Sequence, residues 1–322
     1  SDLMDMAGNG TYHVLATESI NLPYIFDTDG PTSVNSFFTG KSGTAFPAPI
    51  LMTATWNKEL ASEFGDRIGQ ELSDYGFTGW FGSGMDIHRT AFSGRNFEYY
   101  SEDPLISGIM AAGMTEGVQE TVGVGTTIKH FACNNQEDNR FGSDSIISER
   151  ALREIYLQGF EICVKEGKAK AVMSSFNYIG TRWAGGSEEL CNTVLRDEWG
   201  FQGFVLTDYF GVYGYMNSDQ GIRNGTDAML VAYDTETNHV KDQKSATGVE
   251  AMRQACKNIM YTVVNSRAYD AENLETGLMT WQIAAIAADV VLGVGILALE
   301  IVAIKRFRKR LAEEKAAAAV EN

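Results

Sequence analysis

The sequence predicts an α/β fold, a (β/α)8 TIM-like barrel with one strand irregular or missing, followed by a C-terminal transmembrane helix. Three observations support this. Strand-like and helical segments alternate over residues 1–270, polar residues follow the apolar part of several predicted strands, and a long apolar stretch lies near the end of the chain. Alternating strands and helices favour a parallel sheet, and this length suits a barrel.

Short apolar runs between turn residues are the predicted strands. They are residues 23–30, 77–87, 126–133, 169–177, 203–210 and 227–233, with 47–54 as a weaker candidate. Residues with helical periodicity lie between them. These predicted helices are 56–72, where Leu60, Phe64, Ile68 and Leu72 form one apolar face, 148–167 and 248–266.

The composition excludes several classes of protein. The formal net charge is −16, and residues 1–270 contain no basic stripe, so no nucleic-acid partner is expected. Four scattered cysteines match neither a disulfide framework nor a zinc site. The chain has four histidines and no HExxH, Walker or Rossmann fingerprint, so we expect no metal and no cofactor. The opening SDLMDMAGNG is no signal peptide, and we expect residue 1 to lie inside a longer protein.

The C-terminal region predicts a membrane anchor. Residues 281–304 are mostly apolar and long enough to span a bilayer. KRFRKR follows directly and predicts a cytoplasmic end, which places residues 1–270 outside the cell. Residues 271–280 are the predicted linker, and 305–322 form a basic, then Ala/Glu-rich, cytoplasmic tail. Asp289 and Glu300 are costly in lipid, so a surface-lying amphipathic helix is the alternative.

Polar residues at strand ends predict one shared pocket. In a barrel these ends open onto the face that carries active sites. The residues are Asp29, His88, Lys129, His130, Asn177 and Asp208. Carboxylates beside cations, here with Arg95 and Arg140, suit a neutral ligand rich in hydroxyl groups, such as a sugar. A phosphorylated ligand is the alternative, although no convincing Gly-rich phosphate loop is present.

Several motifs together resemble the barrel domain of glycoside hydrolase family 3, of the β-glucosidase type. The resemblance covers about residues 1–266, and its most specific motifs are GRNFEYYSEDP and KHFACNNQE. The others are FDTDGPTSVN, FPAPILMTATWNKEL, MDIHR, VMSSFN and GFVLTDYFG.

The resemblance implies a retaining exo-β-glycosidase of the β-glucosidase type, acting on terminal β-D-glucosyl residues of β-glycosides or oligosaccharides. It implies that Asp208 is the nucleophile. It also implies that the sugar is held by Asp29, Arg95, Lys129, His130 and Arg140. It further implies a bend after the strand at Lys129-His130, and we expect a non-proline cis peptide near His130.

Three departures from the family pattern affect this interpretation. Tyr209 stands where Trp is frequent, and Phe176 stands where a Tyr hydroxyl often contacts the nucleophile. We keep both as substrate-binding candidates. The general acid/base of this type usually lies on a separate α/β sandwich domain after the barrel. Here the predicted membrane helix follows instead, so we expect that domain upstream, in reversed order.

No acid/base residue is assigned within the chain, and the chain by itself is expected to be inactive. A β-xylosidase or related β-glycosidase is the alternative enzyme. The alternative from another class is a catalytically silent, membrane-tethered sugar-binding module.

Overall fold

The computed structural model describes residues 12–14, 16–210, 214–231, 239–269 and 280–320. The chain divides into two compact units, Ser1–Leu274 and Glu275–Asn322. All described strands belong to the first unit, and one long helix makes up the described part of the second.

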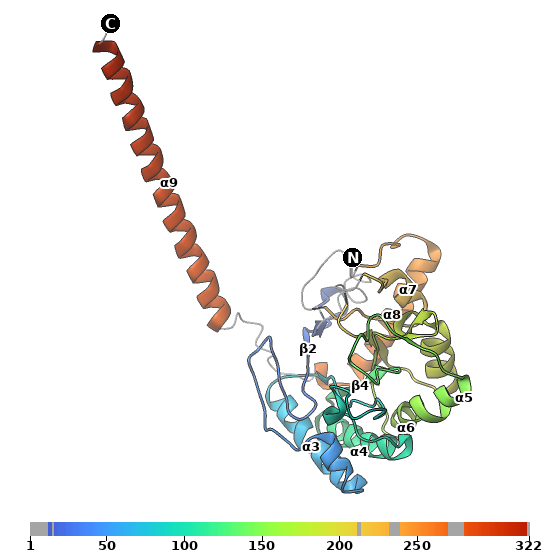
Figure 1. Ribbon diagram of the computed structural model, residues 1–322. Coiled ribbons are helices and arrows are strands. Elements are labelled where there is room, and N and C mark those ends of the chain that lie inside the picture. Colours follow the sequence, from blue (N-terminus) through green and yellow to red (C-terminus); the bar gives the residue numbers. More distant parts are fainter. Residues whose placement is uncertain (1–11, 15, 211–213, 232–238, 270–279, 321–322) are drawn as a thin grey trace. The chain divides into compact units, whose positions relative to one another are not determined.

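A six-stranded sheet forms the centre of the first unit, in the order β1-β2-β3-β4-β6-β9 (Figure 1). β1 is antiparallel to β2, and the other neighbours are parallel. The strands are β1 (His13–Val14), β2 (Ile25–Thr28), β3 (Gly79–Trp80), β4 (Gly125–Phe131), β6 (Ala171–Ser174) and β9 (Phe204–Thr207). A parallel bridge from Leu206 to Ala228 continues the sheet beyond β9. The carboxyl ends of the parallel strands therefore lie at one edge.

The prediction of a barrel-like α/β fold with a parallel sheet is confirmed, but the described residues form only about half of a barrel. After Ala228 the next described helix is α8 (Ala246–Val264). Within the predicted strand 227–233, only the bridge at Ala228 is seen, and residues 232–233 lie outside the described residues.

The prediction of a strand at 47–54 is wrong. This segment contains helix α2 (Pro49–Thr53). Pro49 occupies the first turn, where its fixed φ favours a helix and its missing N–H costs nothing. Thr53 Oγ1 donates to the carbonyl oxygen of Pro49, one helical turn earlier, at 2.7 Å.

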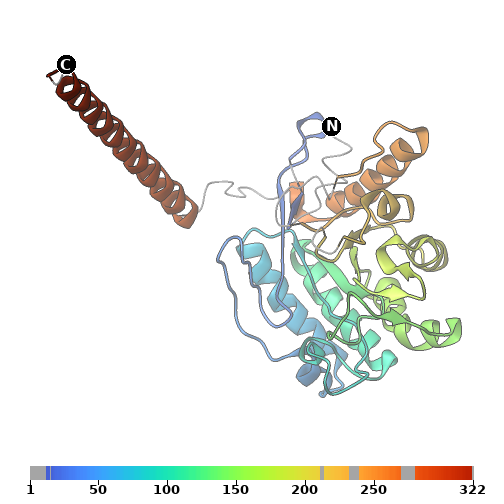
Figure 2. The same cartoon turned by 45° about the horizontal axis from the view of Figure 1, so that its top comes forward.

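The predicted helix at 56–72 is confirmed as α3 (Lys58–Asp74), with Asn57 capping its first turn. The helix predicted at 148–167 is present as α5 (Glu149–Ala151), a π-helical turn (Leu152–Tyr156) and α6 (Gln158–Lys165). The helix predicted at 248–266 is confirmed as α8. Of these helices, α6 packs against β4 and α8 against β9 (Figure 1, Figure 2).

Helix α4 (Pro104–Val122) was not predicted from the sequence, because its apolar residues surround the helix rather than forming one stripe. Asp103 caps its start by accepting from the backbone N–H groups of Leu105 and Ile106. The helix packs against both α3 and α6, which explains why both of its sides are apolar. Glycine at position 65 permits the close approach of α3, since a Cβ there would lie 2.2 Å from the carbonyl oxygen of Met114.

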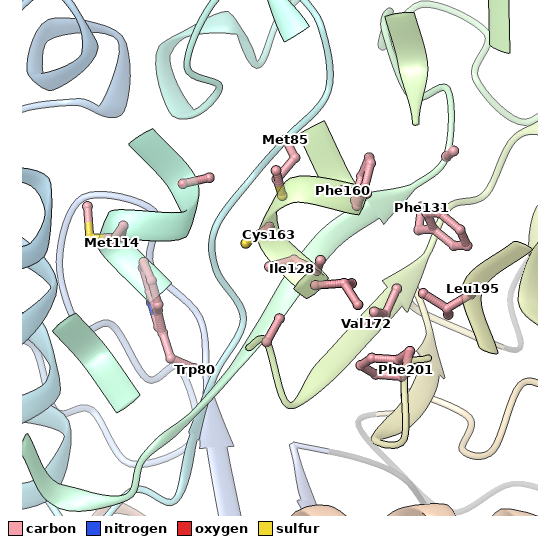
Figure 3. Packing of buried hydrophobic residues seen from close by; sticks show 14 of the residues in the cluster. Trp80, Met85, Met114, Ile128, Phe131, Phe160, Cys163, Val172, Leu195 and Phe201 are labelled. Atoms are coloured by element: carbon pink, nitrogen blue, oxygen red, sulfur yellow. The ribbon is translucent and has the colours of Figure 1, made fainter. Parts of the chain in front are cut away.

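The main hydrophobic core lies between these helices and the strands (Figure 3). Ile128 of β4 and Val172 of β6 are fully buried there, next to Phe160 and Cys163 from α6. β4 is buried along its whole length. This packing fixes where the strands end and therefore where the polar side chains that follow them are placed.

Further elements complete the first unit. A small sheet joins β5 (Asp144–Ser145), β7 (Tyr178–Ile179) and β8 (Arg182–Trp183). A π-helical segment (Glu189–Glu198) precedes β9, and α7 (Ser218–Arg223) follows it.

The second unit contains helix α9 (Thr280–Val320). The segment Ile283–Arg310 has a mean hydropathy of 2.3 and is long and apolar enough to cross a membrane. The helix continues through most of the predicted tail 305–322 instead of ending at residue 304. The predicted linker 271–280 lies, except for residue 280, outside the described residues.

Candidate active site

Residues from three different strand ends meet at the carboxyl edge of the parallel sheet. Asp29 directly follows β2, and Asp208 directly follows β9. Lys129 and His130 lie near the carboxyl end of β4. Lys129 Nζ donates to Asp29 Oδ1 at 3.1 Å, across 100 residues of sequence. His130 Nε2 lies 3.7 Å from Asp208 Oδ2. The structure therefore brings these four predicted site residues into one cluster.

The backbone bends at Lys129-His130, as expected. The Lys129–His130 peptide bond is cis, and so is Phe131–Ala132. The pairing of β4 with β6 also shifts register between Ile128 and Phe131. Adjacent strand residues normally point to opposite faces, yet here both side chains turn to the same cluster. Both residues are buried, with 3% and 1% of their surface exposed.

Asp29 is held at both carboxylate oxygens. Lys129 contacts Oδ1, and the Tyr12 hydroxyl donates to Oδ2 at 3.0 Å. The side chain of Asp29 is nevertheless 41% exposed, so it faces the open side of the cluster. Burial, followed by the charge of Asp29, raises the pKa of Tyr12, which keeps the hydroxyl protonated as a donor. Tyr12 was missed from the sequence because it precedes the strands that carry the motifs.

Asp208 is a buried carboxylate that faces this cluster, with 9% of its surface exposed. Its Oδ1 accepts the backbone N–H of Tyr209 at 2.7 Å. Its Oδ2 has no hydrogen-bond partner within the described part of the chain. Burial raises the pKa of Asp208 to about 6, and the charges of Arg95, Arg140 and Lys129 oppose that rise. The result is a carboxylate that is ionised at neutral pH with one oxygen free.

The two arginines are each fixed by a glutamate. Arg95 pairs with Glu98, and Arg140 Nη1 lies 2.8 Å from Glu137 Oε2. Glu137 also accepts from Asn134 Nδ2 at 2.9 Å. Both arginines act electrostatically on Asp208, so they belong to the same site.

The two aromatic candidates also border the site. Phe176 is buried, and the guanidinium of Arg140 lies 4.5 Å from its ring centroid. Tyr209 follows Asp208 and is half-buried. Phe176 thus supports Arg140 by a cation–π contact instead of offering a hydroxyl to Asp208.

Two residues of the predicted pocket are less directly connected. The backbone N–H of His88 donates to the carbonyl oxygen of Ser101 at 3.2 Å. Asn177 is buried, and its backbone N–H donates to Ser175 Oγ at 3.3 Å. These hydrogen bonds place both residues in the surrounding loops.

Asp86 was missed from the sequence although it is central to the site. It is 3% exposed and its Oδ2 lies 3.1 Å from His130 Nδ1. The Tyr99 hydroxyl lies 3.2 Å from the same nitrogen. The signal was present in MDIHR, where a carboxylate interrupts an apolar run and requires a buried partner.

Metal ligands are not clustered in the structure. Over the described ranges, no group of three or more His, Cys, Asp or Glu side chains could hold a metal ion. All four cysteines are buried free thiols. The polar cluster is therefore made of carboxylates, cations and an imidazole.

Comparison with known families matches residues 6–261 to the family described as glycosyl hydrolase family 3 N terminal domain. The chain belongs to glycosyl hydrolase family 3. Over 193 residues it is 45% identical to a beta-glucosidase of Ruminococcus albus, a match covering 60% of this chain and 20% of the relative. Over 230 residues it is 40% identical to beta-glucosidase A of Butyrivibrio fibrisolvens, covering 69% and 28%.

A solved beta-glucosidase structure supports the fold. Beta-glucosidase 3B from Thermotoga neapolitana, in complex with glucose, superposes with a TM-score of 0.71 at 37% identity. The match covers 80% of this chain and 38% of that protein. The chain thus spans well under half the length of these family 3 relatives.

Proposed function

We propose that this family 3 domain hydrolyses terminal β-D-glucosyl residues with retention of configuration, and that Asp208 is the nucleophile. The observation that carries the proposal is Asp208 itself, a buried carboxylate with one unpaired oxygen next to three cations. The matched relatives from Ruminococcus albus and Butyrivibrio fibrisolvens are beta-glucosidases, and the Thermotoga neapolitana enzyme was solved with glucose.

The chemistry follows from the positions of the side chains. Asp29 accepts hydrogen bonds from sugar hydroxyls, and Lys129 and His130 contact the same hydroxyl groups. Asp208 Oδ2 attacks C1, and the bond from C1 to the leaving oxygen breaks. The positive charges of Arg95 and Arg140 keep Asp208 ionised before the attack. A water then hydrolyses the glycosyl ester and regenerates the carboxylate.

The leaving oxygen needs a proton, and the local glutamates are poor donors. Glu98 pairs with Arg95, and Glu137 pairs with Arg140. Both carboxylates are thus engaged by guanidinium groups. We therefore assign the general acid to an α/β sandwich domain of the same protein outside this chain. In the isolated chain, Asp208 would then become glycosylated only slowly, unless the leaving group departs without a proton.

The test uses such a leaving group. The chain is incubated with 2,4-dinitrophenyl 2-deoxy-2-fluoro-β-D-glucoside, and the adduct is mapped by mass spectrometry. A fluoroglucosyl group on Asp208, absent in Asp208→Asn, is the expected result. If the intact protein binds glucose but forms no adduct, the domain is the silent sugar-binding module. If only the corresponding xyloside forms an adduct, the β-xylosidase alternative is correct.

The second part of the proposal is that α9 anchors the domain in a membrane, with residues 1–270 outside the cell. The apolar segment Ile283–Arg310 and the basic cluster KRFRKR support it. In cells that express the protein, the chain should resist carbonate extraction from membranes. Protease added outside the cells should digest residues 1–270. A chain ending at residue 279 should be extracted. Complete carbonate extraction of the full chain would leave the surface-lying helix as the alternative.

A further inference from the structure

Asp86 binds two backbone groups on the two sides of the bend after β4. Its Oδ2 accepts the N–H of His130 at 3.0 Å, and its Oδ1 accepts the N–H of Asn134 at 2.8 Å. Both residues are buried in the same region, with Asp86 at 3% and Asn134 at 0% exposure. One carboxylate therefore spans the segment from the cis peptide to the start of the following loop.

The same carboxylate also contacts the imidazole of His130. Oδ2 of Asp86 lies 3.1 Å from Nδ1, while the opposite ring nitrogen, Nε2, lies 3.7 Å from Asp208 Oδ2. The imidazole thus lies between two buried carboxylates. Only Nε2 faces the candidate nucleophile, because Nδ1 is occupied by Asp86 and by the hydroxyl of Tyr99.

We propose that Asp86 is a positioning residue that holds the His130 ring in one orientation and one tautomer, with Nε2 directed at Asp208 and the sugar. A carboxylate behind an imidazole fixes which nitrogen carries the proton and how the ring is turned. The sugar contact in this role rests on the proposed glycosidase function, whereas the ring orientation does not.

The charges around the pair agree with this geometry. Burial lowers the pKa of His130, and the nearby charges of Arg95, Lys129 and Arg140 lower it further. Burial raises the pKa of Asp86 to about 8, and the N–H groups of His130 and Asn134 oppose the rise. Removing the Asp86 carboxyl changes the partner of Nδ1 and leaves the ring free to exchange tautomers.

The test is a double-mutant cycle on the rate of dinitrophenolate release from the fluoroglucoside. Asp86→Asn should slow release by about 10- to 100-fold, as expected for loss of a carboxylate behind a functional imidazole. In the His130→Ala background, Asp86→Asn should cause no further loss, because the effect passes through the imidazole. An undiminished loss in that background would overturn the proposal.

Asp227→Asn is the matched control. Asp227 is 2% exposed, accepts the backbone N–H of Val205 at 2.7 Å and lies on the bridged segment beyond β9. Asp227→Asn should lower the stability of the fold. Any effect that it has on the release rate should be the same in the wild type and in the His130→Ala background. If Asp86→Asn does not fold, the same cycle is measured with Asp86→Glu, which keeps the carboxyl group but moves it by one methylene. The same coupling to His130 is expected, and an additive result again overturns the proposal.

A second measurement does not need turnover. The imidazole ¹⁵N signals of the four histidines in the chain can be assigned by single substitution. His130 should show one fixed tautomer in the wild type and an averaged pattern in Asp86→Asn, but not in Asp227→Asn. If the wild type forms no adduct, the proposed enzyme function fails, while these signals still decide the role of Asp86. A fixed, unchanged His130 tautomer in Asp86→Asn would refute the proposed role of Asp86.

Discussion

The nucleophile should lose reactivity below neutral pH, and the structure gives the size of the effect. Burial places the pKa of Asp208 at about 6. The ionised fraction then falls from about 90% at pH 7 to about 10% at pH 5, so adduct formation should slow roughly tenfold. A carboxylate with an ordinary pKa near 4 would lose only about a tenth of its reactivity over the same range.

The assay is dinitrophenolate release from the fluoroglucoside, because this leaving group needs no acid and isolates the nucleophile. Initial rates are measured from pH 4.5 to 8 under subsaturating substrate, with the fold checked by circular dichroism at each pH. A profile with a midpoint near 6 is expected. A flat profile between pH 5 and 7 on a folded chain would refute the argument that burial dominates the pKa of Asp208.

Three further changes test other parts of the molecule. Lys129→Met removes the cation from Asp29 and should weaken glucose binding, measured by calorimetry, by at least about tenfold; unchanged affinity would contradict the assigned contact. Gly65→Ala forces a Cβ towards the carbonyl oxygen of Met114 and should destabilise the fold by about 1–3 kcal/mol in urea; an unchanged midpoint would show that α3 and α4 separate freely. A carboxyl with a raised folded pKa binds its proton more tightly when folded, so its stability contribution is lost as pH rises through that pKa. The urea midpoint should therefore decrease as the pH is raised from 5 to 9. An increase would contradict the raised pKa values of the buried acids, which are Asp27, Asp86, Asp208 and Asp227.

Parts of the fold could be predicted because their patterns are local. The apolar face of α3 repeats every four residues, and the strand-like runs around β4 and β9 end in polar groups. Helix α4 could not be predicted in this way. Helices pack on two of its sides, so it is apolar all round and has no periodicity to detect. The segment 47–54 was wrongly predicted as a strand, because a short apolar run is compatible with a strand or a helix. Pro49 at the first turn is the residue that favours the helix.

The site residues likewise include some that the sequence predicted and some that it did not. Asp29, Lys129, His130 and Asp208 could be proposed because each follows an apolar strand and stands in a recognisable motif. Tyr12 and Asp86 were missed, although the buried carboxylate in MDIHR gave a signal for Asp86. Their roles consist only of contacts with distant residues, such as the one from Asp86 to His130 across 44 positions.

The sequence by itself determined the alternation of strands and helices, the polar residues that end the strands, and the family to which the chain belongs. These are properties of short segments, where periodicity and residue type are sufficient. Only the tertiary structure decided the order of the described strands in the sheet, and that His130 lies between Asp86 and Asp208. Such contacts depend on how separate segments pack, because burial and charge act between side chains that are close in space however far apart they are in sequence.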